Sequence, residues 1–534
     1  MKTKEWKEEV KINGVTYPAD QLNRKQDAEL LTKILVRRSN ANSEKPNKSS
    51  YVINVNAEWG AGKTYFIKRW AKDLKYEHPV VYIDAWSNDF MDSPIITVLA
   101  EIQEQLLKTV NQSYLSKEKK KRFKNLGMSV LPKILAALVK RYGGFDIEEL
   151  FVDENSDTDI SSSTQSNKSL DLSAAMEAMT TQAFKEHSDY KKGVKELKGT
   201  IKELIKYSIE KPKGSLATAR IYPAFIFIDE LDRCRPTYAV EMLEAIKHIF
   251  DVEGLVIVVS THTEELQHTI KALYGNNFNA DNYLRRFFDT KFNLDVEVSA
   301  NLLVANCDFT VLNNHYLEQK SVLLFPLLSP EDIKRQLSSL IAKISNWQNL
   351  TPRSAIQLTD RLLTCIELIS DEKTVDVIVL STLVCLYMFN KPEYDNMYSV
   401  LKENLFTVES KLDLYCKQLN LPHYLKEMVS STRDYEGVKQ LLILGGYERE
   451  TFMYHNSNFA DINLITYFRS FQCVLKRADN IKKTNYMNTF GYNGSGSVSG
   501  SQLLEAYMTF FGVNSFTAND YLNLIGLTSK FADS

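Results

Sequence analysis

One short segment of the chain carries the residue types that bind the phosphates of a nucleotide. Its sequence, AEWGAGKT at residues 57–64, follows an apolar run and precedes a stretch with helical periodicity. Gly60 and Gly62 let the backbone turn closely enough for its N–H groups to point at phosphate oxygens. We expect the Lys63 ammonium to reach the β- and γ-phosphates and the Thr64 hydroxyl to bind Mg²⁺. The segment therefore predicts a P-loop.

Two details of the segment bear on this prediction. Ala57 stands where the P-loop consensus has its first glycine, so we expect a negative φ there and a slightly altered loop entry. A glycine-lysine-threonine match at a helix start also arises by chance, but the preceding strand and the second glycine favour phosphate binding. The residues that we expect around the nucleotide are Trp59, Gly60, Ala61, Gly62, Lys63, Thr64 and Tyr65.

A second, acidic motif supplies groups for hydrolysis. The apolar run Ala224 to Asp229 is followed by Glu230, so two carboxylates lie at the carboxyl edge of the expected sheet. We expect Asp229 to hold Mg²⁺ through its water shell and Glu230 to orient and polarise the attacking water. An acid pair alone is also consistent with a solvated loop. Together with the P-loop, it predicts hydrolysis of ATP with Mg²⁺.

Three further sites could take part in catalysis. The polar end of an apolar run, STHT at 260–263, could sense the γ-phosphate or simply end a strand, and Thr261 is the preferred candidate. Arg285 and Arg286 could provide an arginine finger, or they could belong to a helix with a solvated basic face. Arg353 begins a helix in the C-terminal region and could fold back onto the nucleotide. The sequence leaves these alternatives open.

The elements that must position these residues have the pattern of an α/β protein. Five apolar runs, several of them non-alternating and rich in Val and Ile, predict buried strands of one parallel sheet. Helical stretches such as Tyr65 to Leu74 separate them and provide the crossovers. We expect the fourth run to lie between the P-loop strand and the acidic strand. The runs are Tyr51 to Asn56, Val80 to Asp84, Ala224 to Asp229, Leu255 to Thr261 and Lys291 to Val298.

An insertion separates the second and third predicted strands. About 140 residues lie between them, whereas a crossover normally needs only a few tens. We expect the insertion to occupy residues 94–214, with helices at 94–109 and 185–209. Its segment at about 146–170 is rich in Ser, Asp and Asn, and we expect it to be disordered.

The rest of the chain divides into a core and a helical region. We expect residues 1–93 and 215–300 to form the NTPase core. Residues 301–534 have few strand signals and predict a mainly helical region, including a helix at 375–389. We expect a lid at about 301–370, followed by a region that binds a partner.

Composition limits the partners and the location. The chain has 65 Lys and Arg against 67 Asp and Glu, so no overall positive field is available and any nucleic-acid contact must be local. The first residues contain no signal-peptide pattern, and no window approaches the roughly 20 apolar residues that span a bilayer. We therefore expect a cytoplasmic protein without a membrane segment. The six scattered cysteines predict packing thiols and no metal site.

With both motifs present, the sequence resembles the KAP family of P-loop NTPases. The resemblance rests on the P-loop at 58–64, on DAW at 84–86 and above all on IDELDRCRP at 228–236. The approach LNRK at 22–25 and the later Pro352-Arg353 also fit the family. The resemblance implies a fold similar to AAA+ and STAND ATPases, with ATP and Mg²⁺ as ligands and a long insertion between the two motifs.

The resemblance also bears on the biological role. Many members carry membrane helices in the insertion, but the apolar patch here, at 126–139, is too short and contains Pro132 and Lys133. Bacterial members without such helices occur in phage-exclusion and antiphage defence operons, and the size and insertion of this chain resemble members of the Qat defence system. This implies a nucleotide-driven switch with protein partners from the same operon, and it allows a homo-oligomer.

Two other functions compete with this one. A GTPase-type switch needs an NKxD element after a strand, but the nearest match, NKPE at 390–393, has Glu in the last place. A nucleic-acid motor or loader could use the basic run at 119–122 for phosphate contacts, although such a run is usually a solvated helix face. Asp232 and Arg233 could link the nucleotide state to the following helix, or form a structural ion pair.

Overall fold

The computed structural model of the chain describes residues 5–42, 50–91, 93–108, 110, 116–124, 172–209, 220–326, 333–403, 464–478, 504–505, 508, 512–528 and 530. They belong to two compact units, Met1–Asp295 and Val296–Ser534. The predicted disordered segment at 146–170 and the apolar patch at 126–139 lie outside the described residues. The strands of the first unit are β1 Val10–Ile12, β2 Val15–Tyr17, β3 Tyr51–Asn56, β4 Val80–Asp84, β5 Ala224–Asp229, β6 Leu255–Thr261 and β7 Thr290–Asn293. Its helices are η1 Glu5–Lys7, α1 Arg24–Asn42, α2 Lys63–Leu74, η2 Trp86–Asn88, α3 Pro94–Leu107, α4 Lys117–Lys124, α6 Leu172–Ile209, η5 Leu231–Arg233, α7 Pro236–His248, α8 Thr263–Tyr274 and α9 Ala280–Leu284.

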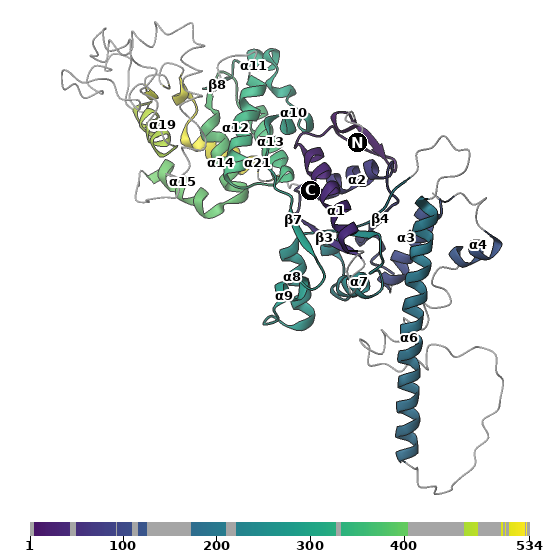
Figure 1. Cartoon of the computed structure of the whole chain (residues 1–534). Helices are drawn as coiled ribbons and strands as arrows, with labels where there is room; N and C mark the ends of the chain where they lie inside the picture. The colour runs from purple at the N-terminus through teal and green to yellow at the C-terminus, as the bar shows by residue number, and fades with distance from the viewer. Residues whose placement is uncertain are drawn as a thin grey trace, which may run out of the picture. The chain divides into compact units, whose positions relative to one another are not determined.

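A parallel sheet of five strands forms the centre of the first unit (Figure 1). The strand order is β4-β5-β6-β3-β7, so β6 lies between the P-loop strand β3 and the acidic strand β5, as predicted. Four strands have the predicted bounds. The fifth differs, because the pattern predicts 291–298 whereas β7 ends at Asn293. It pairs with β3, which ends at Asn56 opposite Asn293, so β7 has no partner beyond that point.

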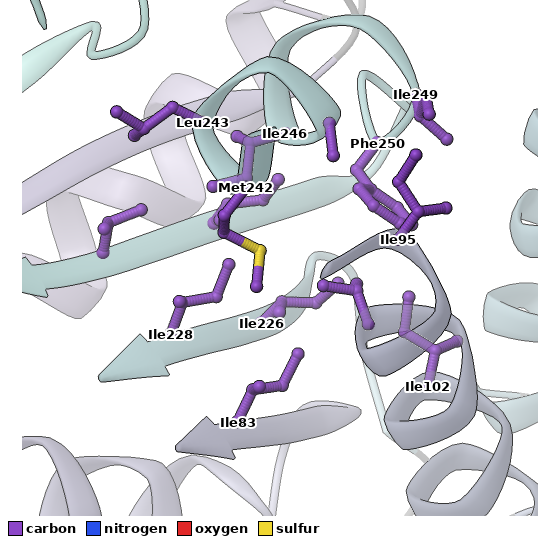
Figure 2. Close-up of a cluster of buried hydrophobic side chains, with 14 of the residues drawn as sticks. Ile83, Ile95, Ile102, Ile226, Ile228, Met242, Leu243, Ile246, Ile249 and Phe250 are labelled. Atoms are coloured by element: carbon purple, nitrogen blue, oxygen red, sulfur yellow. The ribbon is translucent and has the colours of Figure 1, made fainter. Parts of the chain in front are cut away.

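Helices cover both faces of this sheet, and successive residues of each strand alternate between the faces. On one face α2 packs against the sheet, with the rings of Trp70 and Phe227 at 5.1 Å between centroids. On the other face Ile226 and Ile228 of β5 meet α7 and α3 in a buried cluster that includes Met242 (Figure 2). Burial of each such side chain stabilises the fold by about 1.5–3 kcal/mol. The position of a residue in its strand therefore decides which helices it faces.

The N-terminal segment packs on α2. Trp6 is buried beneath it, and its ring lies 6.5 Å from that of Phe66. The Trp6 indole N–H donates to the carboxylate of Asp73, near the end of α2. Strands β1 and β2 follow as a short antiparallel hairpin. These contacts hold the hairpin close to the C-terminal half of α2.

Part of the insertion belongs to the core of this unit. Helix α3 agrees with the prediction within two residues, but α6 begins at Leu172 and is longer than the predicted 185–209 (Figure 1). Leu197, Ile201 and Leu204 of α6 are buried in the same cluster as α3. Their spacing of three and four residues places them on one face of the helix. The C-terminal half of α6 thus anchors the insertion to the NTPase core.

Helices dominate the described part of the second unit. The predicted helix at 375–389 starts later, because Thr374–Asp376 pairs with Leu323–Phe325 as strands β9 and β8. The Asp376 carboxylate then caps α14, accepting the N–H groups of Ile378 and Val379 at 3.0 Å. The helices are α10 Ala300–Asn306, η6 Thr310–Leu312, α11 Asn314–Lys320, α12 Ile333–Trp347, α13 Pro352–Glu367, α14 Val377–Phe389, α15 Lys391–Glu403, α19 Leu464–Ala478, η10 Val513–Ser515 and α21 Ala518–Thr528. No helix among the residues described here has both the length and the apolarity to cross a membrane.

Candidate active site

The P-loop connects β3 to α2 with the backbone conformation that its glycines allow. Gly60 and Gly62 have φ angles of +84° and +82°, and Gly62 is the N-cap of α2. A side chain with a Cβ is strained at these angles, which explains the glycines. Ala57 has no positive φ, as predicted, and its N–H donates to the Thr261 carbonyl at 3.3 Å. The loop entry is therefore tied to the neighbouring strand β6.

Lys63, the first residue of α2, is buried against the loop. Its Nζ donates to the carbonyl oxygens of Ala57 at 2.6 Å and Glu58 at 3.1 Å. Burial lowers the pKa of Lys63, while the nearby carboxylates of Asp232 and Asp229 act in the opposite direction. The ammonium thus lies between the loop backbone and the acidic motif, as a phosphate-binding lysine must.

Asp229 is the last residue of β5 and is fully buried. Its Oδ1 accepts the N–H of Glu230 at 3.0 Å, and its Oδ2 accepts the hydroxyl of Tyr82 at 3.1 Å. Burial raises the pKa of Asp229, whereas the hydroxyls of Ser260, Thr64 and Tyr82 lower it by stabilising the carboxylate. The structure thus surrounds this carboxylate with hydroxyl groups from three different elements.

Glu230 has a backbone conformation that is uncommon for a residue other than glycine. Its φ and ψ are 59° and 31°, in the left-handed region. The Thr64 hydroxyl donates to its Oε1 at 3.3 Å, and the Arg233 guanidinium lies 3.2 Å from the same oxygen. Burial raises the pKa of Glu230, Arg233 lowers it, and the charges of Asp229 and Asp84 raise it further. The left-handed turn directs the carboxylate back towards the P-loop.

These groups can hold a magnesium ion. The Thr64 hydroxyl contacts Glu230 and also stabilises the carboxylate of Asp229, so one hydroxyl and two carboxylates converge. Such hard oxygen donors are the ligands that Mg²⁺ prefers. The donor set fits the ion that the sequence predicts.

Ser260 and Thr261 end β6 and face opposite sides of the sheet. Thr261 is buried, and its hydroxyl donates to Asn54 Oδ1 at 3.3 Å. The β5–β6 register, in which Ile228 pairs with Val259, places Ser260 beside Asp229, whose pKa it lowers. The Ser260 hydroxyl has no hydrogen-bond partner among the described residues. The sequence selects Thr261 as a sensor of phosphate, but Ser260 is the hydroxyl that the structure places beside the acid pair.

The predicted nucleotide residues at the two ends of the loop have other contacts. The Trp59 indole N–H donates to Asp232 Oδ2 at 2.6 Å, while its ring lies edge-on to His262 at 5.9 Å. Tyr65 faces the N-terminal segment, where its hydroxyl donates to the Pro18 carbonyl at 3.1 Å. Burial raises the pKa of Tyr65 to about 12. Trp59 thus joins the P-loop to the acidic motif, whereas Tyr65 joins α2 to the N-terminal segment.

Arg285 and Arg286 lie at the sheet edge opposite the P-loop. They precede β7, which runs parallel to β3, and the P-loop follows the far end of β3. Both are exposed, and Arg285 pairs with Asp281 at 2.9 Å. The structure therefore does not bring them to the nucleotide site of their own chain. Arg353 belongs to the second unit, where it is exposed in the first turn of α13.

The sequence prediction omits Tyr82 and prefers Thr261 to Ser260. Tyr82 belongs to β4, and its role depends on the pairing of β4 with β5, in register from Val80 to Asp84. Ser260 directly precedes the predicted Thr261. Strand alternation indicates that only one of these two neighbours shares a face with Asp229, which was the signal available in the sequence.

Comparisons with known proteins agree with this geometry. Residues 24–364, more than half of the chain, match the model of the KAP family P-loop domain. A search of the curated proteins finds no match. One solved structure similar to the chain is that of the Aeropyrum pernix ORC2 protein in ADPNP–ADP complexes, with 12% identity over 96% of this chain and 95% of that chain. Its TM-score of 0.28 is too low to support an argument. On the family match and the geometry of its two motifs, the chain belongs to the KAP family of P-loop NTPases.

Proposed function

We propose that the chain hydrolyses ATP with Mg²⁺ and that hydrolysis drives a conformational switch. The observation that carries the proposal is the contact between Thr64 of the P-loop and Glu230 of the acidic motif, at 3.3 Å. It brings the phosphate-binding loop and the candidate base into one site. The preference for ATP over GTP rests on the family resemblance. The nearest NKxD-like match, NKPE at 390–393, lies between α14 and the first turn of α15 in the second unit and does not follow a strand.

Each residue of the site has a role that follows from its position. The N–H groups of the loop and the Lys63 ammonium neutralise phosphate charge. Thr64 and Asp229 hold Mg²⁺, which supplies positive charge to the phosphate oxygens when bound. Glu230 orients the attacking water and takes its proton. We assign the sensing of the γ-phosphate to Ser260 in place of Thr261, because Ser260 is buried beside Asp229.

We further propose that any arginine finger from Arg285 or Arg286 acts on the nucleotide of a second copy of the chain. Within one chain, these residues lie beyond the beginning of β3, whereas the phosphates lie beyond its end. Their exposure leaves them accessible to a neighbouring subunit. Arg353 is proposed to approach the nucleotide from the lid.

In the proposed switch, a structural change at the acid pair is transmitted to the helix that follows it. Arg233 of η5 pairs with Glu230 at 3.2 Å and lies over the ring of Trp86 at 5.4 Å. Asp232, its neighbour, accepts the N–H of Trp59. A change at the phosphates can therefore move η5 and the start of α7. By family resemblance, we propose that this switch works in a cytoplasmic antiphage defence complex, with operon-encoded protein partners bound by the C-terminal region.

The proposal is tested by measuring phosphate release and nucleotide binding on the purified chain. We expect release from ATP with Mg²⁺ and much less from GTP. Lys63→Ala should abolish nucleotide binding, because it removes the cation at the phosphates. Glu230→Gln should keep binding and lose at least ~100-fold in turnover. Equal use of GTP would end the ATP preference, and normal turnover in Glu230→Gln would refute the role of Glu230 as base.

A further inference from the structure

Six cations from four separate segments surround two adjoining hollows in the first unit. The larger hollow has a volume of about 530 Å³ and the smaller about 190 Å³, and they share Asn13, Lys75 and Tyr82. The hairpin contributes Lys11, α2 and its C-cap contribute Lys68, Lys72 and Lys75, α3 is followed by Lys108, and Arg220 precedes β5. We call these two hollows the basic cleft.

The cleft extends away from the nucleotide site and meets it at Tyr82, which lines both hollows and whose hydroxyl donates to Asp229 at 3.1 Å. Lys75 follows Lys63 by twelve residues, which at 1.5 Å per residue places it roughly 18 Å further along α2. The lysines at 68, 72 and 75 recur at intervals of four and three residues and so line one face of the helix. The P-loop therefore lies at the start of α2, whereas the lysines of the cleft lie along its middle and at its C-cap.

The positive charge of the cleft is largely uncompensated within the described residues. Of its two acidic side chains, Glu104 pairs with Lys108 at 2.7 Å and Glu101 accepts the Gln105 amide at 2.7 Å. Lys68 lies 5.4 Å above the ring of Tyr82, and no described carboxylate pairs with it. The same holds for the lysines at 11, 72 and 75. The whole chain carries a formal charge of only −2, so this cluster is a local concentration of cations.

We propose that the basic cleft binds the phosphodiester backbone of a single-stranded nucleic acid. Four lysines that pair with no described carboxylate, spread over two joined hollows, match a chain of anions better than a single phosphate. Lysine ammoniums act as point charges and bind phosphate without reading sequence. The larger hollow has the volume of a small-ligand pocket, so it admits an unstacked nucleotide but not the paired and stacked bases of a duplex. The ring of Tyr82 in the wall offers a surface beside which a base can lie.

The basic run at 119–122 is a weaker candidate for the same contact. Lys119 pairs with Glu203 at 3.1 Å and its ammonium lies 4.6 Å from the Tyr207 ring centre, both on α6. This lysine is therefore used to hold α4 against α6. Lys121 is exposed, on the eight-residue helix α4.

The test measures the binding of a labelled 20-nucleotide oligothymidylate to the full chain by fluorescence anisotropy, with no ATP in the solution. With four phosphate contacts, the logarithm of the binding constant should fall with the logarithm of the salt concentration with a slope of about −3. This corresponds to about 50-fold weaker binding in 200 mM than in 50 mM NaCl. The variant Lys68→Gln/Lys72→Gln/Lys75→Gln should bind at least ~100-fold more weakly at 50 mM, with a slope near −1. Lys11→Gln/Lys72→Gln provides a milder variant, with an intermediate loss, if the triple variant does not fold.

The matched control is Lys191→Gln/Lys195→Gln/Lys198→Gln, which removes the same charge at the same spacing from α6. It should bind like the parent chain, and circular dichroism melting checks the folding of all variants. Failure of the parent chain to bind the oligonucleotide would overturn the proposal, as would an equal loss in the control. A duplex or a polyglutamate peptide that binds as tightly as the single strand would overturn the assigned ligand. Oligonucleotide binding is measured without ATP hydrolysis, so its outcome is independent of the ATPase proposal.

Discussion

At the scale of single residues, we expect the two hydroxyls at the end of β6 to differ in their effect, one on turnover and the other on stability. Ser260 lies beside Asp229 with no described hydrogen-bond partner, and Thr261 donates to Asn54. We expect Ser260→Ala to lower kcat by about 100-fold with little change in stability, because a donor to the reacting phosphate is lost. Thr261→Val should instead lower stability by about 1–3 kcal/mol, because Asn54 loses a buried partner. Steady-state kinetics and thermal melting separate the two, and similar kinetic losses would contradict the assignment.

The pKa of Glu230 predicts a pH dependence of turnover. A general base must be ionised, and burial raises the pKa of Glu230 above that of an ordinary glutamate. As the pH falls through this raised value, the carboxylate is protonated and kcat should decline. Arg233 lowers the same pKa, so Arg233→Met should move the acidic limb of the profile to higher pH. A shift of the limb to lower pH, or none, would show that another group controls it.

At the scale of elements, the P-loop turn depends on Gly62. A Cβ at this position would meet no atom within 4 Å, so the cost of Gly62→Ala comes from its φ of +82° alone. We expect a loss of about 1–2 kcal/mol in stability and weaker nucleotide binding. Gly199 in α6 is the matched control, because a Cβ there also has free space and its φ is not positive. Gly199→Ala should stabilise the chain by about 0.5–1 kcal/mol, measured by chemical denaturation.

Helix α2 links two functions along its length. Its N-terminus carries the P-loop lysine and threonine, and three lysines of the basic cleft follow, at 68 and 72 in the helix and at its C-cap, 75. Its buried face, which includes Phe66 and Trp70, packs on the sheet. This packing holds both ends of the helix in place on the sheet. The element that binds phosphate is therefore the same one that presents the proposed nucleic-acid contacts.

At the scale of the whole molecule, an arginine finger in trans requires at least two chains. We expect Arg285→Ala/Arg286→Ala to lose turnover and to keep nucleotide binding, because its own P-loop is intact. Lys63→Ala is inactive but retains both arginines. Mixing the two variants should restore part of the ATPase activity, which is measured as phosphate release over a range of total protein concentrations. Normal turnover of the arginine variant alone would exclude a finger role for both residues.

The sequence by itself determined the elements whose signals are local. Four of the five predicted strands have the observed bounds, because runs of Val, Ile and Phe buried on both faces are unambiguous. The P-loop and the acid pair were equally clear, since their chemistry requires particular residues at fixed spacing. Boundaries that depend on a partner strand were less certain. β7 ends where β3 ends, and β9 replaces the first turn of a predicted helix.

Only the tertiary structure decided which side chains meet. Alternation along β6 separates Ser260 from Thr261, but the register of β6 with β5, in which Ile228 pairs with Val259, determines that Ser260 lies beside Asp229. The direction of β7 places Arg285 and Arg286 at the edge away from the P-loop, which no local pattern reveals. The basic cleft joins residues from positions 11 to 220, and a chain with balanced charge gives no sign of it. Secondary structure follows from nearest neighbours, whereas active sites and charge clusters arise from contacts between distant segments.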